Sequence, residues 1–308
     1  MTLNKGCGNL LKGKYLIVLS LVLLVFNSQV YSQKIINVDS SLHSDNKHFS
    51  LFPTVSYPGD AVLVRSITDG VVEFNETKYR LAKKGAEYLA VLPISIDQQT
   101  GVQEVLLYPS ELNDPPDSGK CQEYLSAKIT IEEKAFSTQY LEVTEDQQAM
   151  IQNEEEIAKD RQKFLYSIAN PAINALFTDS FIKPLDGRIT TKFGFTRYIN
   201  GVLDSRHMAI DIAAAEGTPI FAPNSGRVVL AEYLYLSGNR VIIDHGMGLF
   251  SSFSHLSALN VQAGDSVARG EILGNVGSTG FSTGPHLHHA IYVHGYAVNP
   301  EQFYSLMR

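Results

Sequence analysis

The 308-residue chain contains no tryptophan and only two cysteines, and the shortage of cysteine removes whole classes of protein. Cys7 lies in a segment that we expect to be removed, which leaves Cys121 alone in the mature chain. A disulfide framework and a cysteine-rich metal site are therefore both excluded within it. A single cysteine without a partner that lowers its pKa is typical of a small buried hydrophobic side chain.

The chain also has fewer basic than acidic residues. Lysine and arginine total 25 against 32 acidic residues, which gives a net charge of −7. Without a basic patch, nucleic acid is excluded as the main partner, and so is docking on anionic lipid. The sequence also lacks a His-Glu-x-x-His stretch, which excludes a thermolysin-like zinc site with a glutamate base.

The chain has no apolar run long enough for a membrane span. Residues 16–26 are apolar apart from Ser20, whereas a spanning helix needs about 20 such residues. Three lysines precede this run, and small residues at 30 and 32 precede Gln33. This is the pattern of a secretory signal peptide. We predict a signal peptide over residues 1–32 and a periplasmic or secreted protein, with a membrane anchor only if the segment is retained.

Short β-type runs separated by turn residues follow the leader. They occupy residues 61–64, 70–74, 88–92, 104–108 and 127–131. Strands at this spacing are typical of a β-sandwich. We predict an N-terminal β-sandwich-like domain over residues 33–140, which serves as a structural or docking module.

A helical linker is predicted over residues 141–176. Thr144 and Gln147 have the spacing of a capping box. Met150, Ile157 and Phe164 recur every seven residues and form a narrow apolar stripe, which predicts a helix lying on a surface. Asn170-Pro171 should end it.

From residue 177 the chain turns again to β-type runs rich in glycine, at 188–193, 226–231, 240–244, 250–253 and 271–276. We predict a C-terminal antiparallel β domain over residues 177–308, and hence a protein that is mainly β.

Seven of the nine histidines fall at or after His207, which is the strongest compositional signal in the chain. In a strand, His286 and His288 would share a face, so both could bind one metal or one could bind it while the other works beside it. His207 and Asp211 would lie about 13 Å apart in a straight strand and can share an ion only if the chain bends between them. Zinc takes nitrogen from histidine and oxygen from aspartate, and a catalytic zinc keeps one position open.

Four ordered motifs make the C-terminal region recognisable. They are residues 206–220, residues 241–257 with their Asp244-His245-Gly246 and Ser254-His255-Leu256 segments, residues 277–288, and Val298-Asn299-Pro300. Together they resemble the lysostaphin-type (LytM-like) zinc metalloendopeptidases of peptidoglycan, over residues 181–308. The upstream region resembles the N-terminal parts of some secreted members much more loosely.

This resemblance implies a duplicated hybrid-motif fold with Zn²⁺ held by His207, Asp211 and His288. It implies His255 and His286 as the unligated catalytic pair and leaves open which of the two is the base. The implied substrates are the stem or cross-link peptides of peptidoglycan, with D,D-endopeptidase activity favoured. His289 departs from the family pattern, and its expected direction away from His286 and His288 favours a structural role.

Other functions remain to be weighed. A non-catalytic lysostaphin-like regulator could bind and activate other wall hydrolases. A lipoyl- or biotinyl-like carrier lacks a lysine at a matching turn tip. Residues 280–284 fit Gly-x-Ser-x-Gly, but a nucleophile elbow needs a following helix, and here a strand is expected. The sequence leaves the oligomeric state open.

Overall fold

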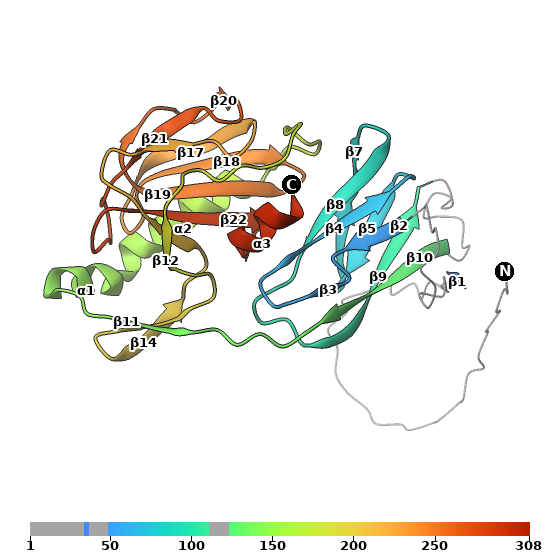
Figure 1. Cartoon of the computed structure of the whole chain (residues 1–308), viewed down its shortest axis with the longest axis horizontal. Helices are drawn as coiled ribbons and strands as arrows, with labels where there is room; N and C mark the ends of the chain where they lie inside the picture. Colours follow the sequence, from blue (N-terminus) through green and yellow to red (C-terminus); the bar gives the residue numbers. More distant parts are fainter. Residues whose placement is uncertain (1–33, 37–48, 111–122) are drawn as a thin grey trace, which may run out of the picture.

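The computed structural model describes residues 34–36, 49–110 and 123–308, and is mainly β as predicted (Figure 1). The predicted leader over residues 1–32 and Cys121 lie outside the described residues. In the described part of the chain, no helix combines the length and apolar character needed to cross a membrane.

Two sheets face each other in the N-terminal domain, which confirms the β-sandwich. Their inner faces share one apolar core that includes Leu51, Val64, Phe74, Leu107 and Ile129. All five predicted strand runs form strands. The first sheet contains β1 (Lys34–Ile36), β10 (Glu123–Ile131), β9 (Gly101–Pro109), β5 (Gly70–Phe74), β6 (Thr77–Arg80) and β3 (Val55–Ser56); the second contains β2 (Phe49–Phe52), β4 (Ala61–Ser66), β8 (Glu87–Pro93) and β7 (Ala82–Lys84).

The connector between the domains is a strand followed by two helices. The strand β11 (Thr138–Leu141) pairs in parallel with β13 (Thr196–Ile199) of the C-terminal domain. Thr144 and Gln147 form the predicted capping box at the start of α1 (Glu145–Gln152). The single predicted helix is wrong in one respect, because it breaks at Asn153. The Asn153 side chain accepts a hydrogen bond from the Glu156 N–H and so begins a second helix, α2 (Glu154–Ile168).

A large, mainly antiparallel sheet forms the C-terminal domain, as predicted, and a small sheet flanks it. The large sheet contains β12 (Arg188–Thr191), β15 (Ile210–Ala213), β16 (Pro219–Phe221), β17 (Gly226–Leu234), β18 (Gly238–Gly246), β19 (Leu249–Leu259), β20 (Ser266–Val267), β21 (Ile272–Val276), β22 (His286–Val293) and β23 (Tyr296–Val298); the small one contains β11, β13 and β14 (Val202–Arg206). The helix α2 packs on β17, where Phe164 and Ile168 contact the apolar cluster of Leu230, Leu234, Ile242 and Phe250.

The two β domains meet through a buried apolar interface. Ala61 and Leu63 of β4 join the same cluster as Phe177, Val293 and Phe303 of the C-terminal side. The short C-terminal helix α3 (Pro300–Leu306) lies between the domains in Figure 1. Its Gln302 side chain accepts from the Ala61 N–H and donates to the Ala61 carbonyl, both at 2.9 Å. The sheet β2-β4-β8-β7 therefore contributes to two cores.

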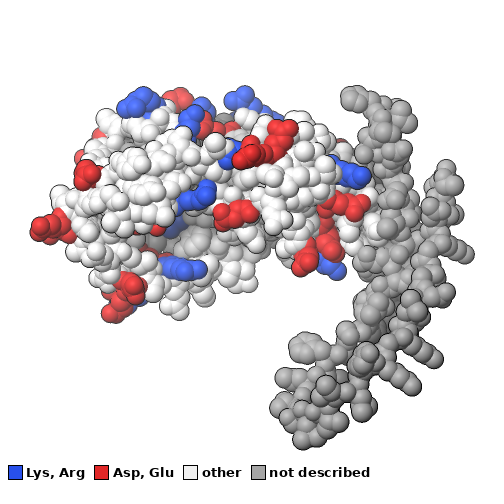
Figure 2. Space-filling model, turned by 90° about the horizontal axis from the view of Figure 1, so that it is seen from below, with Lys and Arg blue, Asp and Glu red and all other residues white. Residues whose placement is uncertain are grey.

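The face of the molecule shown in Figure 2 carries both positive and negative side chains. On this face Lys and Arg lie singly among Asp and Glu and do not merge into a basic area. This agrees with the net charge of −7.

Candidate active site

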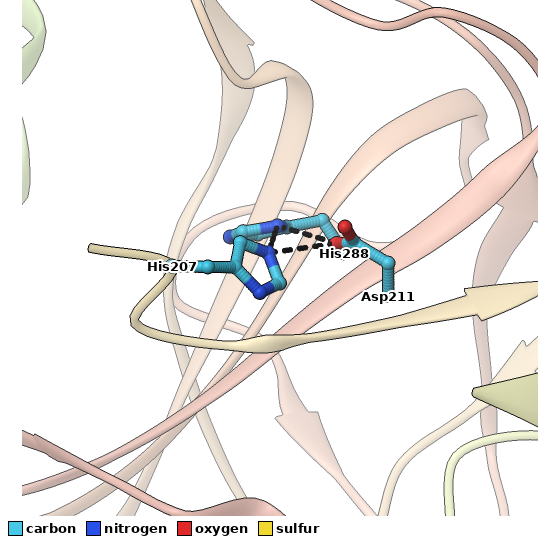
Figure 3. A group of neighbouring side chains, drawn as sticks. All are labelled: His207, Asp211 and His288. Carbon is cyan, nitrogen blue, oxygen red and sulfur yellow. Dashed lines mark hydrogen bonds and ion pairs between the residues drawn. The ribbon is translucent and has the colours of Figure 1, made fainter. Parts of the chain in front are cut away.

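Three predicted ligands come together at the centre of the C-terminal domain. His207 directly follows β14, Asp211 lies in β15, and His288 lies opposite Asp211 in the antiparallel pair β15–β22. The chain bends between His207 and Asp211, as a shared ion would require. The three side chains point toward one another (Figure 3).

Their spacing fits one metal ion. His207 Nε2 lies 3.0 Å from Asp211 Oδ1 and 3.2 Å from His288 Nδ1, and His288 Nδ1 lies 2.9 Å from the same Oδ1. Donors about 2.0–2.1 Å from a tetrahedral zinc lie about 3.3 Å apart, so these contacts are close to the expected edges of the tetrahedron. The His207 Nδ1–H donates to the Lys192 carbonyl, which leaves Nε2 free to bind a cation.

The surroundings of Asp211 and His288 shift their pKa values toward the protonation states of metal ligands. Burial alone would raise the pKa of Asp211, but the contacts of its carboxylate with the His207 and His288 imidazoles outweigh burial and hold that pKa well below its usual range. Burial lowers the pKa of His288 to about 4. The carboxylate is thus ionised and the imidazole neutral at pH 7, which are the protonation states that coordinate zinc.

Two further histidines face the metal centre without joining the trio. His255 lies in β19 and His286 is the first residue of β22. Each ring uses Nδ1–H as a donor, to the carbonyl of Thr279 in one case and of Gly284 in the other, both at 2.8 Å. Each of these bonds leaves Nε2 as the second nitrogen of its ring. Burial, with smaller contributions from His288 and His286, lowers the pKa of His255 to about 3, so this imidazole is neutral at pH 7.

A cleft of about 390 Å³ opens beside the centre. Its lining includes Asp211, His255, His286 and His288 and extends to the loop of residues 281–285. All of its lining residues come from 139–288, so the described residues of the sandwich contribute none.

Sequence reasoning missed one wall of this cleft. Arg197 of β13 lies 3.8 Å from Asp211 Oδ2, and its Nε–H donates to the Gln139 side chain of β11. Gln139 in turn donates to the Thr191 hydroxyl at 3.0 Å. The available signal was Asn200-Gly201 between alternating residues, a pattern that strongly predicts a hairpin; here it joins β13 to β14 with positive φ at both positions.

The remaining sequence expectations can also be placed. His289 is fully buried, donates from Nδ1 to the Ser252 carbonyl at 3.0 Å and contacts the Tyr304 hydroxyl at 2.8 Å through Nε2, which is a structural role. The Gly280–Gly284 segment is followed by strand β22 and not by a helix, so it is not a nucleophile elbow.

One protein-family model matches part of the chain. Residues 205–300 match the model of peptidase family M23. The match contains His207, Asp211, His255, His286 and His288. Zinc is the cofactor of M23 metallopeptidases, and the His–Asp–His group fits it.

Several curated proteins are similar to part of the chain. The DD-carboxypeptidase/endopeptidase Mpg of Neisseria meningitidis is 41% identical over 113 residues, which cover 37% of this chain and 26% of that protein. The peptidoglycan DD-endopeptidase ShyA of Vibrio cholerae is 40% identical over 93 residues, covering 30% of this chain and 22% of that one. The glycyl-glycine endopeptidase ALE-1 of Staphylococcus capitis is 35% identical over 112 residues, with 36% and 31% covered. The chain thus spans less than a third of the length of these relatives.

One solved structure resembles most of the chain. A putative M23 peptidase from Pseudomonas aeruginosa covers 82% of this chain and 96% of its own, with a TM-score of 0.60 and 22% identity. This likeness extends beyond residues 205–300 and supports the fold over most of the chain.

Proposed function

We propose that this protein is an exported zinc endopeptidase that hydrolyses the peptide cross-links of peptidoglycan, with D,D-endopeptidase specificity. The observation that carries the proposal is the convergence of His207, Asp211 and His288 next to two histidines, His255 and His286, whose rings line the same cleft. A regulator that only binds other hydrolases would not need this set.

The roles of the side chains follow from their protonation states. Zinc, when bound, polarises the scissile carbonyl and makes a coordinated water more acidic. His255 holds a neutral ring, and both it and His286 line the cleft with Nε2 outside their backbone hydrogen bonds, so one of the two can take the proton of the attacking water. The proton is then available for the departing amine, and the other imidazole can hydrogen-bond the reacting groups.

The D,D specificity rests on similarity and is the finer part of the proposal. The DD-carboxypeptidase/endopeptidase Mpg and the DD-endopeptidases ShyA and ShyC are 41%, 40% and 36% identical over their matched regions, and the glycyl-glycine endopeptidase is 35% identical over its own.

Digestion of defined muropeptides tests the function. The zinc-loaded protein is incubated with D,D cross-linked dimers and with glycine-bridged peptides, and products are identified by mass spectrometry. We expect dimers to be converted to monomers with release at the D,D bond. Cleavage of glycine bridges alone would overturn the specificity. No hydrolysis by a protein with one zinc per chain would instead favour the regulator.

Export is tested separately by N-terminal sequencing of the mature protein. A chain beginning at Gln33 supports cleavage of the predicted leader. A retained residue 1–32 segment in the membrane fraction would show an anchor.

A further inference from the structure

The carboxylate of Asp160, on the connector helix α2, forms hydrogen bonds with a turn of the C-terminal domain. The two oxygens of Asp160 accept hydrogen bonds from consecutive backbone N–H groups, those of Tyr235 and Leu236, each at 3.0 Å. Bonds to an ionised acceptor are stronger than neutral ones, and using both oxygens fixes the orientation of the turn. Asp160 is half-buried and lies 75 and 76 residues from its partners in sequence.

The turn bound by Asp160 joins β17 to β18. Two of its backbone carbonyls accept hydrogen bonds from segments that form the active site. The Ser237 carbonyl accepts from the His255 N–H at 2.8 Å, and the Leu236 carbonyl accepts from the Phe281 N–H at 2.8 Å. The first of these bonds reaches a catalytic candidate. The second reaches the loop that lines the cleft.

His255 needs such support because its backbone is strained. Its φ of 67° lies in the left-handed region that non-glycine residues rarely adopt. A strained residue persists where its surroundings determine its conformation. For His255 these are the Ser237 carbonyl at its N–H and the Thr279 carbonyl at its Nδ1.

The turn also supports Thr279 itself. The Thr279 hydroxyl accepts from the Asn239 N–H at 3.0 Å and donates to the Leu256 carbonyl at 2.8 Å. At Gly238 a Cβ would come within 2.2 Å of that hydroxyl, so the turn and Thr279 are in direct contact. Displacement of the turn would therefore disturb both groups that fix the His255 ring.

We propose that Asp160 is a positioning residue for catalysis: through the 235–238 turn it holds the His255 imidazole facing His286 across the cleft. This inference rests on the proposed endopeptidase function for its effect on rate, but not for its effect on His255. It makes the connector helix part of the support of the active site, in addition to its role in joining two domains.

The test replaces Asp160 by asparagine. Asp160→Asn keeps the shape but has one acceptor oxygen, so one of the two turn N–H groups loses its partner. The matched control is Glu154→Gln, which removes the same charge from an exposed position of the same helix. In zinc-loaded protein we expect kcat to fall about ten- to a hundredfold in Asp160→Asn, the scale of a sub-ångström misplacement. The KM, the zinc content and the control's rate should remain near wild type.

A readout at His255 separates positioning from general damage. Imidazole ¹⁵N spectra of histidine-labelled protein, assigned with His255→Ala, should show the His255 signals shifted in Asp160→Asn and unchanged in Glu154→Gln. Asp160→Asn should also have no further effect on kcat in the His255→Ala background. His255 signals at wild-type positions in Asp160→Asn, or a kcat loss that multiplies with that of His255→Ala, would overturn the proposal. If the wild type itself cleaves no muropeptide, the endopeptidase function fails, and the spectra still decide the positioning.

Discussion

His255 and His286 face each other with ring centroids 4.8 Å apart, and each donates its Nδ1–H to a backbone carbonyl. Both rings are therefore held through Nδ1, and both line the same cleft. This pairing is what distinguishes them from His288, whose Nδ1 faces Asp211.

Replacing either unligated histidine by alanine should slow hydrolysis without removing zinc. We expect kcat/KM to fall by about 10²–10⁴-fold in His255→Ala and in His286→Ala, the range for loss of a positioned acid–base group. Zinc per chain should stay at the wild-type value, because neither ring belongs to the trio. Rates and metal content come from dimer digestion and elemental analysis. A wild-type rate in both variants would contradict the assigned roles.

Loss of a ligand should remove both metal and activity. In Asp211→Ala and His288→Ala we expect zinc content and hydrolysis to fall together, and a chelator should do the same reversibly in the wild type. Because zinc binds the folded state, its removal should also lower Tm. His294→Ala serves as the control, since His294 contacts Tyr79 and not the trio. Full zinc retention in both ligand variants would refute the site.

Buried His245 should make stability depend on pH. Its Nδ1–H donates to the Ser225 carbonyl and its Nε2 accepts from the Ser251 hydroxyl, while burial lowers its pKa to about 4. Between the unfolded value near 6.5 and 4, the unfolded chain binds a proton that the folded chain does not. Stability should therefore fall as pH drops through this window, by about 1.4 kcal/mol per unit from this group. Urea unfolding at pH 7.5 and 5.0 measures it, and His245→Gln should show a shallower dependence. An identical dependence in both proteins would exclude His245 as a source.

The interface between the domains should behave as core. Leu63 is 5% exposed in the shared cluster, so Leu63→Ala should lower the free energy of unfolding by about 2–5 kcal/mol. The control Leu165→Ala, at a leucine that is 51% exposed, should change it little. We also expect one cooperative transition by circular dichroism and by calorimetry. Two separate transitions, of which only one shifts, would contradict a shared core.

The strands could be predicted from the sequence because their signals are local: alternation and turn residues mark β4, β5 and β8. The ligand set was predicted in another way, from the resemblance of the ordered histidine motifs to a known family. The bend between His207 and Asp211 was also accessible, because a straight strand cannot bring both to one ion.

Features that depend on distant pairing could not be derived in the same way. The pairing of β11 with β13 and the hydrogen bonds of Asp160 join segments 58 or more residues apart, and no local pattern specifies them. The break at Asn153 was missed for a different reason. The apolar stripe continues past Asn153, so the pattern predicts one uninterrupted helix. The break depends on one side chain, that of Asn153, which accepts the Glu156 N–H and so begins a new helix.

The double role of β4 has a consequence for any shortened form of the protein. Ala61 and Leu63 cover apolar side chains on the C-terminal side that include Phe177 and Val293. A chain starting after the sandwich would expose that patch to water, and contiguous exposed apolar surface promotes self-association. The solubility of the C-terminal domain thus depends partly on β4, which precedes that domain by more than a hundred residues.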